Sequence, residues 1–129
     1  WRAHTEPELL KKWLLGPDGW SLTVCEVDLV VGGSYRYWWE GPAEAFGFEG
    51  EHLVIDAPRR VVTTEQMTGT EHPATVNDLQ MYEEDGATLL TLIVTYPDAT
   101  TRDLVLATGM LAGMETSYDR LEREVLERI

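Results

Sequence analysis

The chain has 129 residues, of which 43% are hydrophobic and 26% charged, so it is long and apolar enough for one globular domain with its own core. Its formal net charge is −13, and phosphate backbones and anionic lipid headgroups would repel such a surface. Nucleic acid and membrane are therefore not expected as partners. No segment reaches the roughly 18 apolar residues that a membrane-spanning helix needs.

Cys25 is the only cysteine, which excludes an intrachain disulfide and a metal site built from several cysteines. The valines around it predict a strand, and we interpret it as a packed thiol rather than a nucleophile. Because no signal-peptide pattern is visible, a cytoplasmic location is the default expectation. Trp1 is not an initiator methionine, so a targeting segment before it would be missing from this sequence.

A short helix is predicted near the N-terminus. Thr5 is a suitable cap, Pro7 suits the first helical turn, and Gly16-Pro17 is expected to end the helix. Leu10 and Trp13 would lie on its inward face. The helix is short, so packing must stabilise it.

The next two predicted strands are joined by Gly32-Gly33, which favours a two-residue hairpin loop. That register would place Asp28 opposite Tyr37 and Glu26 opposite Trp39 on one face of the sheet. Both faces mix polar and apolar residues, so periodicity alone does not say which face is inside.

Two further strands precede the clearest hairpin of the sequence. Asp85-Gly86 is a strong signal for a type I′ turn between two alternating runs. A two-residue loop there pairs Met81 with Leu90 and Leu79 with Leu92. We expect this apolar face to be the inner one, directed toward the last helix.

The last third of the chain, from Pro97 onward, is predicted to be helical. Asp98 is a suitable cap for a first segment that ends near residue 106, and Gly109 is expected to interrupt the helix. The main helix then runs to the C-terminus. Its apolar residues recur at helical spacing: Met110, Met114, Tyr118, Leu121 and Val125.

Short motifs along nearly the whole chain follow the order found in one known family. They are Glu6-Pro7-Glu8-Leu9-Leu10, Gly16-Pro17, Cys25-Glu26-Val27-Asp28-Leu29, Gly32-Gly33-Ser34-Tyr35-Arg36, Phe48-Glu49-Gly50, Ala57-Pro58-Arg59, Thr63-Thr64-Glu65, Gly109-Met110, Gly113-Met114 and Ser117-Tyr118-Asp119-Arg120-Leu121. On these motifs the chain resembles the activator of heat-shock protein 90 ATPase homologue-like family. That family belongs to the START-like, birch-allergen-like helix-grip (SRPBCC) superfamily.

The resemblance implies an α+β helix-grip fold, with residues 1–129 forming a single START-like domain. A curved antiparallel sheet would wrap around the long C-terminal helix. The family also has a strand before its first helix, which has no counterpart here, so the sheet would lack it or take it from residues outside this sequence. Leu14, Val30 and Val54 replace the family's usual Trp, Arg and Glu, which removes polar groups that could orient a ligand.

In this fold the space between sheet and helix can hold a ligand, so we interpret the chain as a binding protein for a small hydrophobic or aromatic molecule. No cofactor is expected. The predicted lining is Tyr35, Tyr37, Trp39, Phe48, Leu79, Met81, Leu90 and Leu92 on the sheet, with Met110, Met114 and Tyr118 on the helix.

An enzyme of the cyclase or aromatase type is the first alternative, with Glu26, Asp28 or His52 as a proton-transferring group in the cavity. The simpler interpretation has exposed carboxylates and a structural His52, while His4 and His72 would be solvated surface residues. No metal-binding, serine-elbow or phosphate-binding motif is present, so a binding role is favoured over catalysis.

A second alternative is a chaperone-interacting module, as the resemblance suggests. It predicts an exposed apolar patch around Trp38. The same patch would also serve as a homodimer interface.

Overall fold

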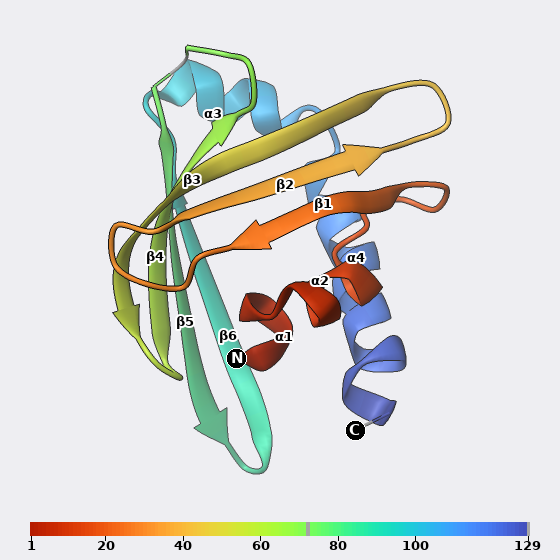
Figure 1. Ribbon diagram of the computed structural model, residues 1–129, viewed down its shortest axis with the longest axis vertical. Coiled ribbons are helices and arrows are strands. Elements are labelled where there is room, and N and C mark those ends of the chain that lie inside the picture. The colour runs from red at the N-terminus through yellow and green to blue at the C-terminus, as the bar shows by residue number, and fades with distance from the viewer. Residues whose placement is uncertain (72, 129) are drawn as a thin grey trace.

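In the computed structural model, residues 1–71 and 73–128 are described, and they form a curled antiparallel sheet with helices on its concave side (Figure 1). Two short helices come first, α1 (Arg2–Thr5) and α2 (Pro7–Trp13). The strands are β1 (Ser21–Val27), β2 (Ser34–Glu40), β3 (Ala45–Asp56), β4 (Arg60–Met67), β5 (Thr75–Glu84) and β6 (Ala87–Thr95). The chain continues through α3 (Ala99–Leu106), α4 (Met110–Glu124) and a 3-10 turn, η1 (Leu126–Arg128).

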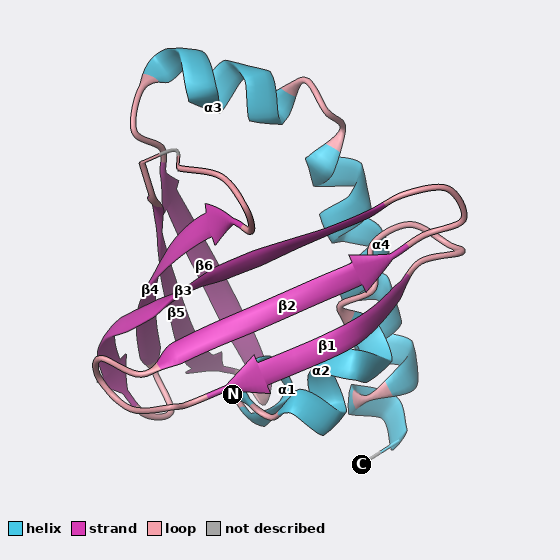
Figure 2. Ribbon diagram, turned by 45° about the horizontal axis from the view of Figure 1, so that its top comes forward, coloured by secondary structure: helices cyan, strands magenta, loops and turns pink. Residues whose placement is uncertain are grey.

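The strands follow one another across the sheet in the order β1-β2-β3-β4-β5-β6, and each pairs antiparallel with the next. Figure 2 shows the sheet curving around α1, α2 and α4, while α3 lies at one end of the molecule. This architecture confirms the predicted α+β helix-grip fold. No helix in residues 1–71 and 73–128 is both long and apolar enough to span a membrane.

The N-terminal helix lies where it was predicted, but its predicted cap is wrong. Thr5 is the last residue of α1, and its hydroxyl donates to the Trp1 carbonyl oxygen at 2.9 Å. Glu6 instead occupies the N-cap of α2 without a side-chain capping bond. The Thr5 hydroxyl therefore bonds within α1, whereas the sequence pattern assigns it to the start of α2.

The predicted register of β1 and β2 is also wrong. Cys25 pairs with Tyr37, and Glu26 pairs with Arg36. Gly32-Gly33 does not form a two-residue loop, because β1 ends at Val27 and β2 begins only at Ser34. The Gly32 amide instead donates to the His52 carbonyl oxygen of β3 at 2.8 Å. The connection is therefore longer, and Cys25 rather than Glu26 is directed toward the concave side.

The second predicted hairpin is confirmed. Asp85 and Gly86 have φ angles of 52° and 79°, the left-handed values that a type I′ turn requires. Leu79 pairs with Leu92 and Met81 pairs with Leu90, as the turn signal predicts.

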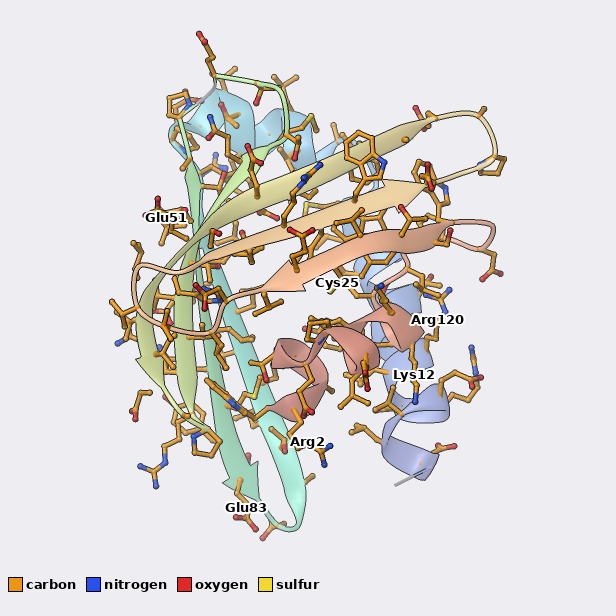
Figure 3. The ribbon with its side chains drawn as sticks, in the orientation of Figure 1. Arg2, Lys12, Cys25, Glu51, Glu83 and Arg120 are labelled. Carbon is orange, nitrogen blue, oxygen red and sulfur yellow. The ribbon has the colours of Figure 1, made fainter. Side chains whose placement is uncertain are left out.

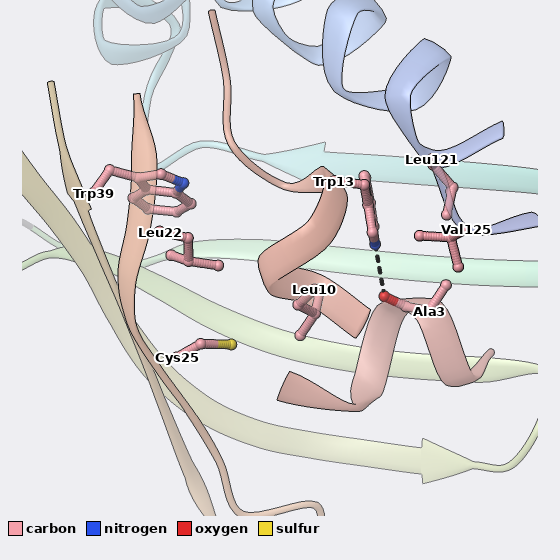
Figure 4. Packing of buried hydrophobic residues seen from close by; sticks show 8 residues of the cluster. All are labelled: Ala3, Leu10, Trp13, Leu22, Cys25, Trp39, Leu121 and Val125. Atoms are coloured by element: carbon pink, nitrogen blue, oxygen red, sulfur yellow. Dashed lines mark hydrogen bonds between the residues drawn. The ribbon is translucent and has the colours of Figure 1, made fainter. Parts of the chain in front are cut away.

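The two predicted C-terminal helices and the break between them are confirmed, but α4 ends at Glu124 and η1 follows it, so the prediction that the main helix runs to the C-terminus is wrong. Asp98 accepts a hydrogen bond from the Thr101 amide at 2.7 Å and caps α3, while Gly109 separates α3 from α4 at a φ of 80°. The apolar stripe of α4 is present, but its C-terminal half packs on the N-terminal helices rather than directly on the sheet. Figure 4 shows this cluster, which contains Ala3, Leu10, Trp13, Leu22, Cys25, Trp39, Leu121 and Val125.

Arg120 joins α4 to the end of α2 (Figure 3). Its guanidinium donates to the carbonyl oxygens of Trp13 at 3.1 Å and Gly16 at 3.2 Å, and it reaches the Asp18 carboxylate at 3.3 Å. The Arg120 side chain is only 11% exposed. It therefore adds a second donor to the Trp13 carbonyl oxygen, which also accepts from the Leu15 amide, and supplies a donor to the Gly16 carbonyl oxygen just beyond the end of α2.

Candidate functional site

An aromatic row covers the concave face of β2 and β3. The ring centroids of Tyr35 and Tyr37 lie 5.1 Å apart, those of Tyr37 and Trp39 lie 5.8 Å apart, and Phe48 lies 5.8 Å from Trp39. Alternate residues of a strand share a face, and Phe48 pairs with Tyr37 across the two strands. The sequence-predicted residues of these strands thus lie together.

Much of this concave face is accessible to water. Tyr35, Trp39 and Met81 are buried. The other predicted sheet residues are only half-buried, namely Tyr37, Phe48, Leu79, Leu90 and Leu92. A close-packed core would exclude solvent from apolar side chains, so these residues keep part of their surface open to water on the concave side.

The helix side carries the three remaining predicted residues. A groove of about 450 Å³ runs along α4 and is lined by Leu111, Met114, Glu115, Tyr118 and Asp119. Met110 is contacted by Tyr96, which directly follows β6 and whose hydroxyl lies 3.6 Å from the Met110 sulfur. The role of these side chains in ligand binding stays a prediction.

Two of the three catalytic candidates of the cyclase-like alternative point away from the aromatic row on the concave face. Glu26 and Asp28 are exposed, because the observed register places Glu26 beside Arg36 on the convex face. His52 is 4% exposed, and its Nδ1 lies 3.0 Å from the Gly33 carbonyl oxygen. A carbonyl only accepts, so His52 donates from Nδ1 and holds the β1–β2 connection against β3.

Glu65 on β4 is an inward-facing carboxyl that the sequence analysis did not single out. It is half-buried, and Asn77 Nδ2 donates to its Oε2 at 3.2 Å. Burial raises the pKa of Glu65. Burial is also the main cause of the raised pKa values of the neighbouring Tyr35, Tyr37 and Tyr96, and the negative charge of Glu65 raises them further.

A register for β4 and β5 would have revealed Glu65. Val61 pairs with Leu79, and Glu65 pairs with Thr75 on the same face. Without that pairing, Thr63-Thr64-Glu65 only indicates a strand with a polar end. Strand alternation becomes informative once one residue of the strand is known to face inward.

Cys25 also lies on the concave side, and the interpretation as a packed thiol is supported. It is 8% exposed, and burial raises its pKa to about 11. The sulfur is therefore protonated at neutral pH, whereas the nucleophilic form of cysteine is the thiolate.

The interpretation of His4 as a solvated residue is wrong, and His72 lies outside the described residues. The His4 ring centroid lies 4.9 Å from that of Trp13 and 5.8 Å from that of Tyr118. His4 Nε2 lies 3.2 Å from the Tyr118 hydroxyl oxygen. Because α1 folds back against α2 and α4, burial lowers the pKa of His4 to about 4.

Acidification should destabilise the protein through His4. In the unfolded protein the His4 imidazole has a pKa near 6.5, whereas in the folded protein the buried ring becomes protonated only near pH 4. The contribution of His4 to the free energy of unfolding is thus fully present above the pKa of the unfolded state and is lost as the pH falls toward the pKa of the folded state. We expect His4 to contribute a loss of about 2 kcal/mol between about pH 7.5 and about pH 5.

Urea unfolding of the natural protein and of His4→Phe at both pH values measures this contribution. Phenylalanine keeps an aromatic ring against Trp13 and Tyr118 but does not titrate. The pH-dependent loss should be smaller in the variant by about 2 kcal/mol. Equal losses in the two proteins would show that His4 is not the group responsible.

The expected exposed patch around Trp38 is not present. Trp38 is half-buried and packs over Gly47, where an added Cβ would lie 2.6 Å from Trp38 Cε3. Large exposed apolar side chains lie instead on the outer face of β5 and β6, including Tyr82, Leu89 and Ile93. Within the described ranges, no group of His, Cys, Asp and Glu side chains is arranged to hold a metal ion.

The fold is shared with solved structures. A protein from Rhodobacter sphaeroides is 32% identical, with 98% of this chain and 83% of that chain covered and a TM-score of 0.89. A protein from Nitrosomonas europaea is 27% identical, with 99% and 85% covered and a TM-score of 0.86. One from Mycobacterium smegmatis is 26% identical, with 97% and 80% covered and the same TM-score of 0.86.

Comparison with the curated proteins finds no match. The profile of the family described as "Activator of Hsp90 ATPase homolog 1-like protein" matches residues 1–125, nearly the whole chain. The Rhodobacter sphaeroides structure supports the same assignment at 32% identity. The chain therefore belongs to the Activator of Hsp90 ATPase homolog 1-like family and has a helix-grip fold, which is in general a ligand-binding fold.

Proposed function

We propose that this protein binds a small hydrophobic or aromatic molecule between the concave face of the sheet and α4. The observation that supports the proposal is the half-burial of aromatic and apolar side chains on an inner face. When an apolar ligand removes the remaining surface of such side chains from water, binding is stabilised by about 25 cal/mol per Å² of buried apolar surface.

The chemistry of the two walls suits such a ligand. The aromatic row of β2 and β3 supplies large flat surfaces. Met110 and Met114 supply the opposite wall, and methionine side chains adapt their shape to an irregular ligand. The helix-grip fold adds a general expectation of ligand binding but does not identify the ligand.

Thermal unfolding with a panel of hydrophobic and aromatic compounds tests the proposal. A compound that binds only the folded protein should raise the melting temperature by roughly 10 °C at about a hundredfold excess over its Kd. If no compound of the panel binds saturably, the proposal is wrong.

Substitutions at two neighbouring residues of β6 test where the compound binds. Leu92 pairs with Leu79 on the concave face, whereas Ile93 is 54% exposed on the outer face. Leu92→Gln should weaken binding of the best compound roughly tenfold, because a polar amide then lies against its apolar surface. Ile93→Gln should leave the affinity unchanged, and equal effects would place the compound elsewhere.

A further inference from the structure

Glu65 is a carboxylate on the concave face that has no cationic partner among the described residues. Its one hydrogen bond comes from the neutral Asn77 amide at 3.2 Å. The arginines that form ion pairs do so elsewhere, as Arg60 does with Asp78 at 2.8 Å. A carboxylate withdrawn from water without an opposite charge is unfavourable, which is consistent with the raised pKa of Glu65.

The other groups near Glu65 also suit a cation. The rings of Tyr35 and Tyr37 lie next to each other, with centroids 5.1 Å apart, and the face of an aromatic ring attracts an ammonium group. No basic side chain is among those that raise or lower the pKa of Glu65.

The electrostatic field of the whole molecule is negative, like the charge of Glu65. The formal net charge is −13, and the groove along α4 is lined by Glu115 and Asp119. Negative side chains at a concave surface raise the local concentration of cations and repel anions. An organic anion would have to overcome both this field and Glu65.

From this arrangement we propose that the ligand carries a protonated amine, which pairs with the Glu65 carboxylate while its apolar part lies on the aromatic row. The inference rests on the proposed function, because it concerns the same concave face. It names the ligand class as an apolar or aromatic amine, as opposed to a neutral hydrocarbon or an acid.

Two probes of nearly equal shape test the inference. 1-Naphthylmethylamine is cationic at neutral pH, and 1-naphthalenemethanol is its neutral counterpart. Calorimetric titration of the natural protein should give a Kd for the amine that is roughly ten- to a hundredfold lower than for the alcohol. This comparison requires no variant.

Glu65→Gln then identifies the group responsible. Glutamine has nearly the same shape and keeps an oxygen for Asn77, so the variant should bind the alcohol as before and lose the preference for the amine. Glu26→Gln is the matched control, because it removes the same charge from an exposed position on the convex face. It should keep the preference.

A merely structural role of Glu65 predicts a different pattern. If Glu65 binds the ligand, removing its desolvated charge should raise the melting temperature of Glu65→Gln. If Glu65 is instead structural, Glu65→Gln should lower the affinity for both probes. The inference is overturned if the natural protein binds the alcohol as tightly as the amine, or if Glu65→Gln keeps the preference. Absence of saturable binding by both probes would overturn the proposed function itself.

Discussion

Trp13→Ala should lower the free energy of unfolding by about 4 kcal/mol, the largest loss that we expect from a single substitution. Trp13, the last residue of α2, is 1% exposed and packs between α1 and α4. Its indole Nε1 donates to the Ala3 carbonyl oxygen at 2.8 Å, as the dashed line in Figure 4 marks. Alanine would leave both a cavity and an unpartnered carbonyl.

Urea unfolding at neutral pH measures this loss, and Trp38→Ala is the matched control. Trp38 is the same residue type on the outer face of β2, where it is half-buried over Gly47. Its removal exposes a surface that water can already reach, so we expect less than half of the loss. Equal losses for the two variants would mean that the helix cluster is not the main core.

Arg120→Met should lower the free energy of unfolding by about 3 kcal/mol. Methionine retains the apolar part of the side chain against α2, so the loss comes from the guanidinium. Its removal leaves the Gly16 carbonyl oxygen without its donors and takes one of two donors from the Trp13 carbonyl oxygen, which keeps the Leu15 amide at 2.8 Å.

Asp18→Asn separates the carbonyl contacts from the ion pair. The Asp18 side chain is 99% exposed, and ion pairs at exposed positions contribute little. Urea unfolding of this variant should resemble that of the natural protein. A loss as large as that of Arg120→Met would assign the effect to the ion pair instead.

Local chemistry explains which parts of the fold were predictable. Asp85-Gly86 defines its own hairpin, because both residues adopt left-handed φ angles and the turn alone sets the pairing of Met81 with Leu90. Asp98 and Gly109 likewise mark the ends of α3 within a few residues of sequence.

The errors arise where distant contacts decide the structure. Gly32-Gly33 is tied to β3 through His52, and nothing near the two glycines in the sequence indicates this. The stripe of α4 was predicted, but its contact with α1 and α2 depends on how the N-terminus folds back. The inward position of Glu65 could not be predicted for the same reason, because it depends on the pairing of β4 with β5.

The two ends of α4 differ in how firmly they are anchored. Leu121 and Val125 are 5% and 2% exposed in the core cluster, whereas Met110 follows a glycine and is only half-buried. The helix is therefore held mainly at its C-terminal end. Under the proposed function, ligands of different length would displace the methionine end while the core cluster stays intact. Amide hydrogen exchange should accordingly be faster at Met114 than at Leu121.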